Sequence, residues 1–178
     1  MLFDLLSMGA QRTYDLDSQD KVVGTFTLNN GKQVSLEDWR GHPVLVVNTA
    51  TLCGFASQYR GIQNLHEAYK DRGLYVLAVS SNDFLQERKD AEAVKKYCET
   101  TFGLTYPMTE ITHVLGSNAH SFYRDLKNHL AFTPTWNFNK VLIDTEGRVA
   151  ASWGVNTSPE SRNVKRAIEK ILSASGAG

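Results

Sequence analysis

The sequence has few cysteines and no long apolar segment. It contains two cysteines, Cys53 and Cys98, in 178 residues, too few for the disulfide framework of a small secreted domain. No cysteine and histidine spacing typical of a zinc site is present. No stretch approaches the roughly 20 apolar residues that a transmembrane helix needs. We therefore expect a soluble protein without a membrane span, a metal or another cofactor.

The sequence also lacks a surplus of charge of either sign. Nineteen Lys and Arg balance nineteen Asp and Glu. Because nucleic acids and anionic lipid surfaces attract a basic field, we expect neither as a partner. The length and the 42% apolar content suit a single domain with one core.

The first residues lack the features of a secretory signal peptide. MLFDLLSMGAQ is apolar, but Asp4 interrupts it and no basic flank precedes the apolar stretch. We expect residues 1–20 to form a mobile or surface-helical N-terminal extension, residues 21–173 the domain and residues 174–178 a disordered tail. We expect a cytoplasmic location, with the periplasm as the alternative if a signal peptide was present upstream or is degenerate.

The order of predicted elements is typical of the thioredoxin fold, an α/β class with an N-terminal hairpin and a central mixed sheet flanked by helices. Asn30-Gly31 predicts the hairpin turn between strands near residues 23–28 and 32–34. Apolar runs predict buried strands at 42–50 and 74–80. Further patterns predict helices over 59–69, 90–103 and 119–130, a hairpin over 140–154, and a closing helix with Pro159 in its first turn.

Cys53 lies where a buried strand is predicted to give way to a helix, in VVNTATLCGFASQY. Reactive groups collect beyond the carboxyl ends of central strands in open α/β sheets, and a helix N-terminus favours a thiolate over a thiol. Ala56 stands where a dithiol oxidoreductase carries its second cysteine. A lone thiolate suits attack on the O–O bond of a peroxide. On these residues alone, an inert buried cysteine is an equally good interpretation.

Four segments, in order, resemble the glutathione peroxidase family in its cysteine form. They are VNTATLCGFASQYRGIQNLHEAYKDRGLYVLAVSSNDFLQE, YCETTFGLTYPM, NAHSFYRDL and PTWNFNKVLIDTEGRV, and the likeness covers roughly Phe26 to Trp153. The resemblance implies a thiol peroxidase of antioxidant defence. Such an enzyme reduces hydrogen peroxide and organic hydroperoxides, lipid hydroperoxides among them, to water or alcohol.

The resemblance also implies a catalytic set. The family's peroxidatic cysteine, glutamine, tryptophan and asparagine match Cys53, Gln86, Trp136 and Asn137. Their neutral N–H groups stabilise a thiolate without neutralising it and orient the peroxide. NDFLQER departs from the family pattern, with one residue fewer before Gln86 and with Arg88 in place of proline. The alternatives are a solvated loop glutamine for Gln86, and a core aromatic residue followed by a turn amide for the pair Trp136 and Asn137.

Asp83 and His120 are expected to be structural. Asp83 stands where many relatives have glutamine. His113 and His120 are too far apart for one helical face of a zinc site, and His120 is expected to start or pack a helix.

Cys98 admits two interpretations. Its segment resembles the one in which thioredoxin-dependent relatives carry a resolving cysteine, about one residue away when aligned on Pro107. In that role it condenses with the sulfenic acid of Cys53, which requires its helix to unwind locally. It also lies on the apolar stripe of that helix, so a buried structural thiol is the alternative.

The resemblance bears on partners as well. Only KNHLAFT separates the third predicted helix from PTWNF, whereas tetrameric glutathione-using relatives insert a long loop there. It therefore implies a monomer or weak dimer that uses thioredoxin or glutathione as reductant. Two other functions stay open. A thioredoxin-like disulfide oxidoreductase needs a cysteine at Ala56 or a nearby resolving thiol. A non-enzymatic thioredoxin-fold binding or copper-handling protein of the periplasm needs a Cys-x-x-x-Cys pair plus histidine, and Ser57 occupies the second cysteine position.

Overall fold

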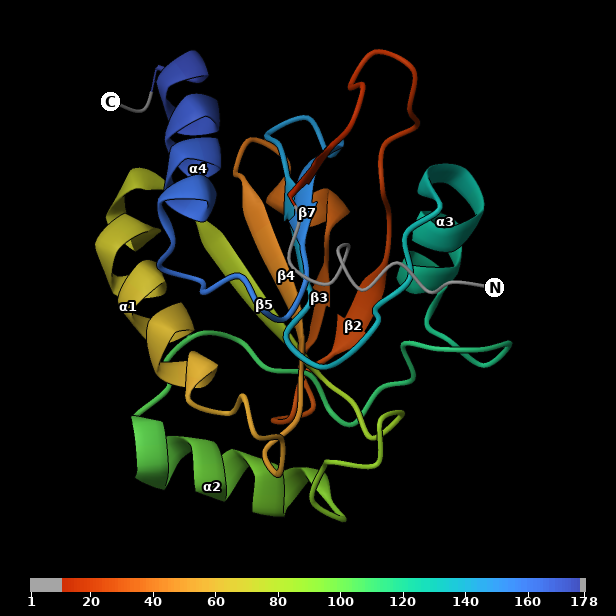
Figure 1. Ribbon diagram of the computed structural model, residues 1–178, viewed down its shortest axis with the longest axis vertical. Coiled ribbons are helices and arrows are strands. Elements are labelled where there is room, and N and C mark those ends of the chain that lie inside the picture. Colours follow the sequence, from red (N-terminus) through yellow and green to blue (C-terminus); the bar gives the residue numbers. More distant parts are fainter. Residues whose placement is uncertain (1–10, 177–178) are drawn as a thin grey trace.

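The computed structural model describes residues 11–176, and its centre is a five-stranded mixed sheet of order β1-β7-β6-β4-β5 (Figure 1). Strands β4 and β5 pair in parallel, whereas the other neighbours in this sheet are antiparallel. A separate antiparallel hairpin joins β2 and β3. The strands are β1 (Arg12–Thr13), β2 (Thr25–Thr27), β3 (Gln33–Ser35), β4 (Val44–Thr49), β5 (Tyr75–Ser80), β6 (Lys140–Ile143) and β7 (Val149–Trp153).

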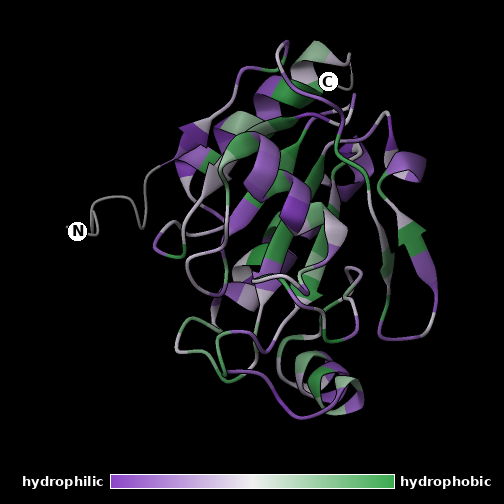
Figure 2. Cartoon of the chain, turned by 90° about the vertical axis from the view of Figure 1, so that its right-hand side faces the viewer, coloured by the Kyte–Doolittle hydropathy of each residue, from purple (hydrophilic) through white to green (hydrophobic). Residues whose placement is uncertain are grey.

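Helices cover both faces of the sheet, which confirms the predicted thioredoxin-type α/β fold. Figure 1 shows α1 and α4 on one side and α3 with the β2–β3 hairpin on the other. Hydrophobic residues gather on the central strands, and the outer helix faces are largely hydrophilic (Figure 2). The helices are α1 (Gln58–Tyr69), α2 (Ala91–Phe102), α3 (Ser121–Leu130) and α4 (Arg162–Ala174), with short 3₁₀ turns η2 (Glu37–Trp39) and η3 (Lys70–Arg72).

Strand β4 is buried along its whole length because its alternate residues face two cores. Leu45 and Val47 pack with α1 and α4, while Val44 and Val46 pack with α3 and β2. This two-sided burial is what a continuous apolar run predicts for a central strand. It fixes the end of β4, from which the Cys53 segment departs.

The start of α4 and the presence of β1 differ from the sequence expectations. Helix α4 begins at Arg162, because the Ser161 hydroxyl accepts the Val164 N–H at 3.4 Å and caps it. Pro159 therefore precedes the helix, and the prediction that it lies in the first turn was wrong. Strand β1 lies in the expected N-terminal extension and was not predicted. Residues 1–10 and 177–178 lie outside the described residues, so the first half of the extension and the end of the tail are not described.

Helix α2 lies at the end of the sheet where the chain passes from β4 to α1 (Figure 1). The Asp90 carboxylate caps its start by accepting the Ala93 N–H at 2.7 Å. Gly103, at φ 61°, ends it in the left-handed conformation that glycine adopts readily. The helix buries Val94 and Cys98.

Asp83 fixes the loop that follows β5. Its carboxylate accepts the N–H groups of Val114 at 2.6 Å and Leu115 at 2.9 Å, and lies 2.7 Å from Nδ1 of His113. Burial by itself would raise the pKa of this carboxyl. The hydrogen bonds outweigh burial and lower the pKa below its usual 3.8. Asp83 therefore has a structural role, as predicted.

Replacing Asp83 by asparagine should lower the free energy of unfolding at pH 7 by about 1–3 kcal/mol. A neutral amide has one acceptor oxygen in place of two and accepts hydrogen bonds more weakly than a carboxylate does. A lowered folded-state pKa means that the carboxylate stabilises the fold above the unfolded pKa, and that this contribution is lost as the pH falls through the folded pKa. Urea unfolding should therefore show a difference between wild type and Asp83→Asn that shrinks towards acid pH. Asp38→Asn, at an exposed position, is the control. An equal difference at neutral and acid pH would contradict this account.

Candidate active site

Cys53 is buried, with 5% of the residue exposed, in a run of turns between β4 and α1. Helix α1 begins only at Gln58, so the prediction of a helix N-terminus at Cys53 was wrong. The reason is that the chain first forms i to i+3 turns, with the Ala56 N–H donating to the Cys53 carbonyl at 2.9 Å. The Phe55 N–H lies 3.4 Å from Cys53 Sγ. A local backbone amide thus donates to the sulfur.

Gln86 and Asn137 lie together beside the Cys53 segment. The Asn137 Nδ2 donates to Gln86 Oε1 at 3.4 Å. The backbone N–H of Leu52, the residue before Cys53, donates to the Gln86 carbonyl at 2.8 Å. Gln86 is half-buried and Asn137 is buried, so Gln86 is not a fully solvated loop residue.

Trp136 is half-buried and packs against the same core as Cys53. Its ring lies 5.2 Å from the Phe84 ring, centroid to centroid. Its carbonyl accepts Nδ2 of Asn48 and Nδ2 of Asn139, each at 2.9 Å. These contacts join the Trp136 turn to strand β4, from which the Cys53 segment continues.

The four predicted site residues thus converge from three segments of the chain. Within residues 11–176, however, the hydrogen bond described for Cys53 Sγ comes from Phe55 N–H, and none comes from Gln86, Trp136 or Asn137. The structure brings the segments together without joining these side chains to the sulfur.

Glu87 is a buried carboxylate at the site that the sequence reasoning did not single out. Its Oε1 accepts the Thr51 N–H at 2.9 Å and the Thr51 hydroxyl, and its Oε2 accepts the Ser80 hydroxyl at 2.8 Å. Thr51 precedes Cys53 by two residues, and Glu87 follows Gln86 directly. Glu87 therefore fixes the Cys53 segment and the glutamine loop to each other. The available signal was a hydroxyl residue at the end of each buried parallel strand, which needs a polar partner.

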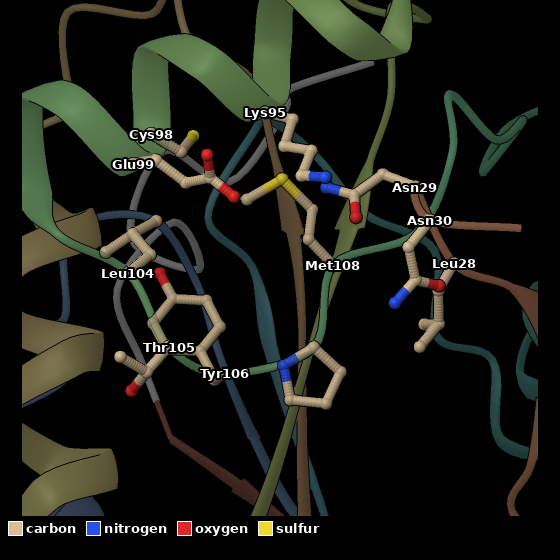
Figure 3. Close-up of a pocket in the computed structure, with 11 residues that line it drawn as sticks. Leu28, Asn29, Asn30, Lys95, Cys98, Glu99, Leu104, Thr105, Tyr106 and Met108 are labelled. Carbon is tan, nitrogen blue, oxygen red and sulfur yellow. The ribbon is translucent and has the colours of Figure 1, made fainter. Parts of the chain in front are cut away.

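Cys98 faces the interior from α2 and is 2% exposed. Burial, and secondly the negative charge of Glu87, raise the pKa of its thiol to about 12. It is therefore a neutral thiol at pH 7. Cys98 also lines a cavity of about 380 Å³ between α2 and the β2–β3 turn (Figure 3). One side of α2 is thus incompletely packed, although Cys98 and Cys53 belong to one core.

His120, in the segment NAHSFYRDL, has a structural role. His120 caps α3, because its Nδ1 accepts the Phe122 N–H at 3.1 Å, and its Nε2 donates to the Thr25 carbonyl at 2.8 Å. Its ring stacks on Phe26 with centroids 4.0 Å apart. The predicted helix-start and packing role of His120 is confirmed. Within residues 11–176, no group of three or more His, Cys, Asp or Glu could hold a metal.

The described helices include none that is long and apolar enough to span a bilayer.

Comparisons with known proteins identify the family. The family model described as glutathione peroxidase matches residues 24–127. A glutathione peroxidase of Lactococcus lactis is 38% identical over 148 residues, which cover 80% of this chain and 93% of the relative. The glutathione peroxidase-like peroxiredoxin GPX5 of Chlamydomonas reinhardtii is 38% identical over 157 residues, which cover 85% of this chain and 95% of the relative.

Solved structures give the same result for the fold. The crystal structure of Trgpx in apo form has a TM-score of 0.66 and 28% identity, and the match covers 84% of this chain and 92% of that one. A thiol:disulfide interchange protein of Chlorobium tepidum has a TM-score of 0.67 at 18% identity, covering 89% of this chain and 99% of that one. The latter likeness concerns the fold alone. The family match over more than half of the chain, with these identities across most of both partners, shows that the chain belongs to the glutathione peroxidase family and is a thiol peroxidase.

Proposed function

We propose that Cys53 is the peroxidatic residue and that Gln86, Trp136 and Asn137 are its catalytic partners. The observation that carries this proposal is the Asn137–Gln86 hydrogen bond beside the Leu52–Gln86 backbone bond, which gathers three segments at the nucleophile. The Cys53 thiolate attacks one peroxide oxygen, the S–O bond forms and the O–O bond breaks. The leaving oxygen takes a proton and departs as water or an alcohol, and Cys53 becomes a sulfenic acid.

The substrates we propose are hydrogen peroxide and organic hydroperoxides, including those of lipids, in antioxidant defence. Large apolar side chains flank the site residues and are exposed: Leu52 by 56%, Phe55 by 39% and Leu85 by 86%. They can contact the organic part of a hydroperoxide. In support, a Synechocystis relative at 36% identity is a hydroperoxy fatty acid reductase.

Replacing Cys53 by serine should abolish turnover of hydrogen peroxide and of cumene hydroperoxide, a loss of about 1000-fold or more, because an alcohol is barely ionised at neutral pH and is a weak nucleophile. Peroxide consumption and thermal unfolding should be measured together. An unchanged melting temperature shows that the fold survives. Full peroxidase activity in the folded variant would refute the role of Cys53.

We further propose that Cys98 resolves the oxidised enzyme. Once α2 opens, burial no longer raises the pKa of the Cys98 thiol; the thiol gives up its proton and its sulfur attacks the sulfur of the Cys53 sulfenic acid, so that an S–S bond forms and the hydroxide that leaves takes a proton and departs as water. Cys98 shares a core with Cys53, and the cavity beside α2 lowers the packing lost when the helix opens. A dithiol such as thioredoxin then reduces the disulfide, with glutathione as the second candidate reductant. The structural-thiol alternative rests on the burial of Cys98.

Replacing Cys98 by serine should separate the two halves of the cycle. The rate constant for Cys53 oxidation should stay within about twofold, whereas thioredoxin-driven turnover should fall by about tenfold or more, because the sulfenic acid can no longer form the intramolecular disulfide. Mass spectrometry of peroxide-treated wild type should show a Cys53–Cys98 disulfide.

Full thioredoxin-driven turnover in Cys98→Ser would favour the structural thiol. Wild-type rates with glutathione far above those with thioredoxin would reverse the proposed order of reductants.

A monomer or weak dimer in a reducing compartment, the cytoplasm, completes the proposal. Only five residues, 131–135, lie between the end of α3 and Trp136. This link is too short to hold the long loop with which tetrameric members of the family make subunit contacts.

A further inference from the structure

Lys140, the first residue of β6, is a buried amine with 0% exposure. Its Nζ donates to the Gln58 side-chain oxygen at 2.7 Å, to the Phe138 carbonyl at 2.7 Å and to the Gly154 carbonyl at 3.4 Å. All three acceptors are uncharged, and the ion pairs described for residues 11–176 include none with Lys140. Burying a cation without a counter-ion is unfavourable, so these hydrogen bonds must matter to the fold or to the site.

One acceptor, the Phe138 carbonyl, belongs to a turn in which Phe138 itself has a left-handed backbone conformation. Phe138 has φ 63°, a conformation that bulky side chains rarely adopt and that persists where the surroundings hold it. Its N–H donates to the Asn48 carbonyl at 2.6 Å, and its carbonyl accepts the Lys140 amine. Phe138 directly follows Trp136 and Asn137. The amine therefore holds one of the peptide groups that fix this turn.

Another acceptor, the side-chain oxygen of Gln58, belongs to the helix that follows the Cys53 turns. Gln58 is the first residue of α1. Its Nε2 donates to the Val155 carbonyl at 2.7 Å while its Oε1 accepts from Lys140. Lys140 thus joins the Trp136 turn to the start of α1 and to the chain after β7, across 82 residues of sequence.

The hydrogen bonds do not depend on one protonation state. Burial lowers the pKa of Lys140 to about 7. A neutral amine has two N–H donors and an ammonium has three. Both forms can therefore reach Gln58 and Phe138.

We propose that Lys140 is a positioning residue for peroxide reduction: its amine locks the turn that presents Trp136 and Asn137 to the segment that presents Cys53. This inference rests on the proposed roles of those three residues. Lys140 acts through Phe138 and Gln58, and contact with the peroxide is not part of its role. Reaction rates are sensitive to displacements of about 1 Å at such a site, so loss of this link should slow the peroxide step.

The test uses Lys140→Met, whose unbranched side chain is one atom shorter than that of lysine and has no hydrogen-bond donor. The rate constant for oxidation of Cys53 by hydrogen peroxide, measured in a single turnover, should fall by about tenfold or more. Alkylation of Cys53 by iodoacetamide, measured at a pH at which the thiol is fully ionised, should change by less than about twofold, because iodoacetamide has no peroxide bond for the Trp136 turn to orient. Lys127→Met, at an exposed position on α3, is the matched control and should leave both rates unchanged.

A double-mutant cycle with Asn137→Ala identifies the path of the effect. If Lys140 acts through the turn, Lys140→Met should add little to the loss that Asn137→Ala causes. Additive losses, or equal slowing of peroxide oxidation and alkylation, would show general support of the fold and overturn the inference. If Lys140→Met does not fold, Gln58→Met removes one acceptor and should slow the peroxide step in the same direction, and an unchanged rate there would also overturn it.

Failure of the underlying proposal is recognisable separately. If Asn137→Ala leaves the peroxide rate unchanged, the assigned catalytic role of Asn137 is wrong. If Asn137→Ala slows the reaction and Lys140→Met does not, only the inference on Lys140 is wrong.

Discussion

The site depends on the parallel pairing of β4 and β5 and on the carboxylate that closes its end. Parallel strands bring their carboxyl ends to one edge of a sheet. Here that edge carries the buried Ser80 at the end of β5 and the buried Thr51, two residues beyond the end of β4. Their polar groups would lack partners there without Glu87, which accepts from both. A buried carboxylate is tolerated when several donors compensate its desolvation. Because Glu87 adjoins Gln86, this one group sets where the glutamine lies relative to the Cys53 segment.

The buried ionisable groups near the site, Glu87 and Lys140, bind neighbouring segments, and the hydrogen bond described for the Cys53 sulfur comes from a backbone N–H. The proposed partners of Cys53 are neutral: an indole, two amides and a backbone N–H. Glu87 accepts a hydrogen bond from Thr51 in the Cys53 segment, and Lys140 donates one to the Phe138 carbonyl in the Trp136 turn. With the roles proposed above, this arrangement offers neutral dipoles to a Cys53 thiolate without a permanent cation that would neutralise it. The segments that carry the neutral groups are therefore fixed by two buried ionisable side chains, Glu87 and Lys140.

Helix α2 is held differently from the helices that cover the sheet. The Arg88 guanidinium lies 4.2 Å from the centroid of the Tyr97 ring, and Phe102 packs on Tyr59 at 5.5 Å. Arg88 thus makes a contact between the glutamine loop and α2. With a cavity along one side, α2 has the sparse anchoring typical of elements that open locally. That property is the one a resolving role for Cys98 requires.

The sequence by itself determined the central strands, the helices and the identity of the candidate site residues. Apolar runs, helical periodicity and short motifs around Cys53 and Trp136 are local signals, and burial on both faces of β4 leaves little alternative to a central strand. Tertiary structure alone decided the roles of Glu87 and Lys140, because their partners lie 36 and 82 residues away along the chain. It also decided that turns, rather than a helix, follow Cys53, since the two differ in hydrogen-bond register and not in composition. A two-residue strand such as β1 exists only through its pairing with β7, and that pairing leaves no pattern in so short a sequence.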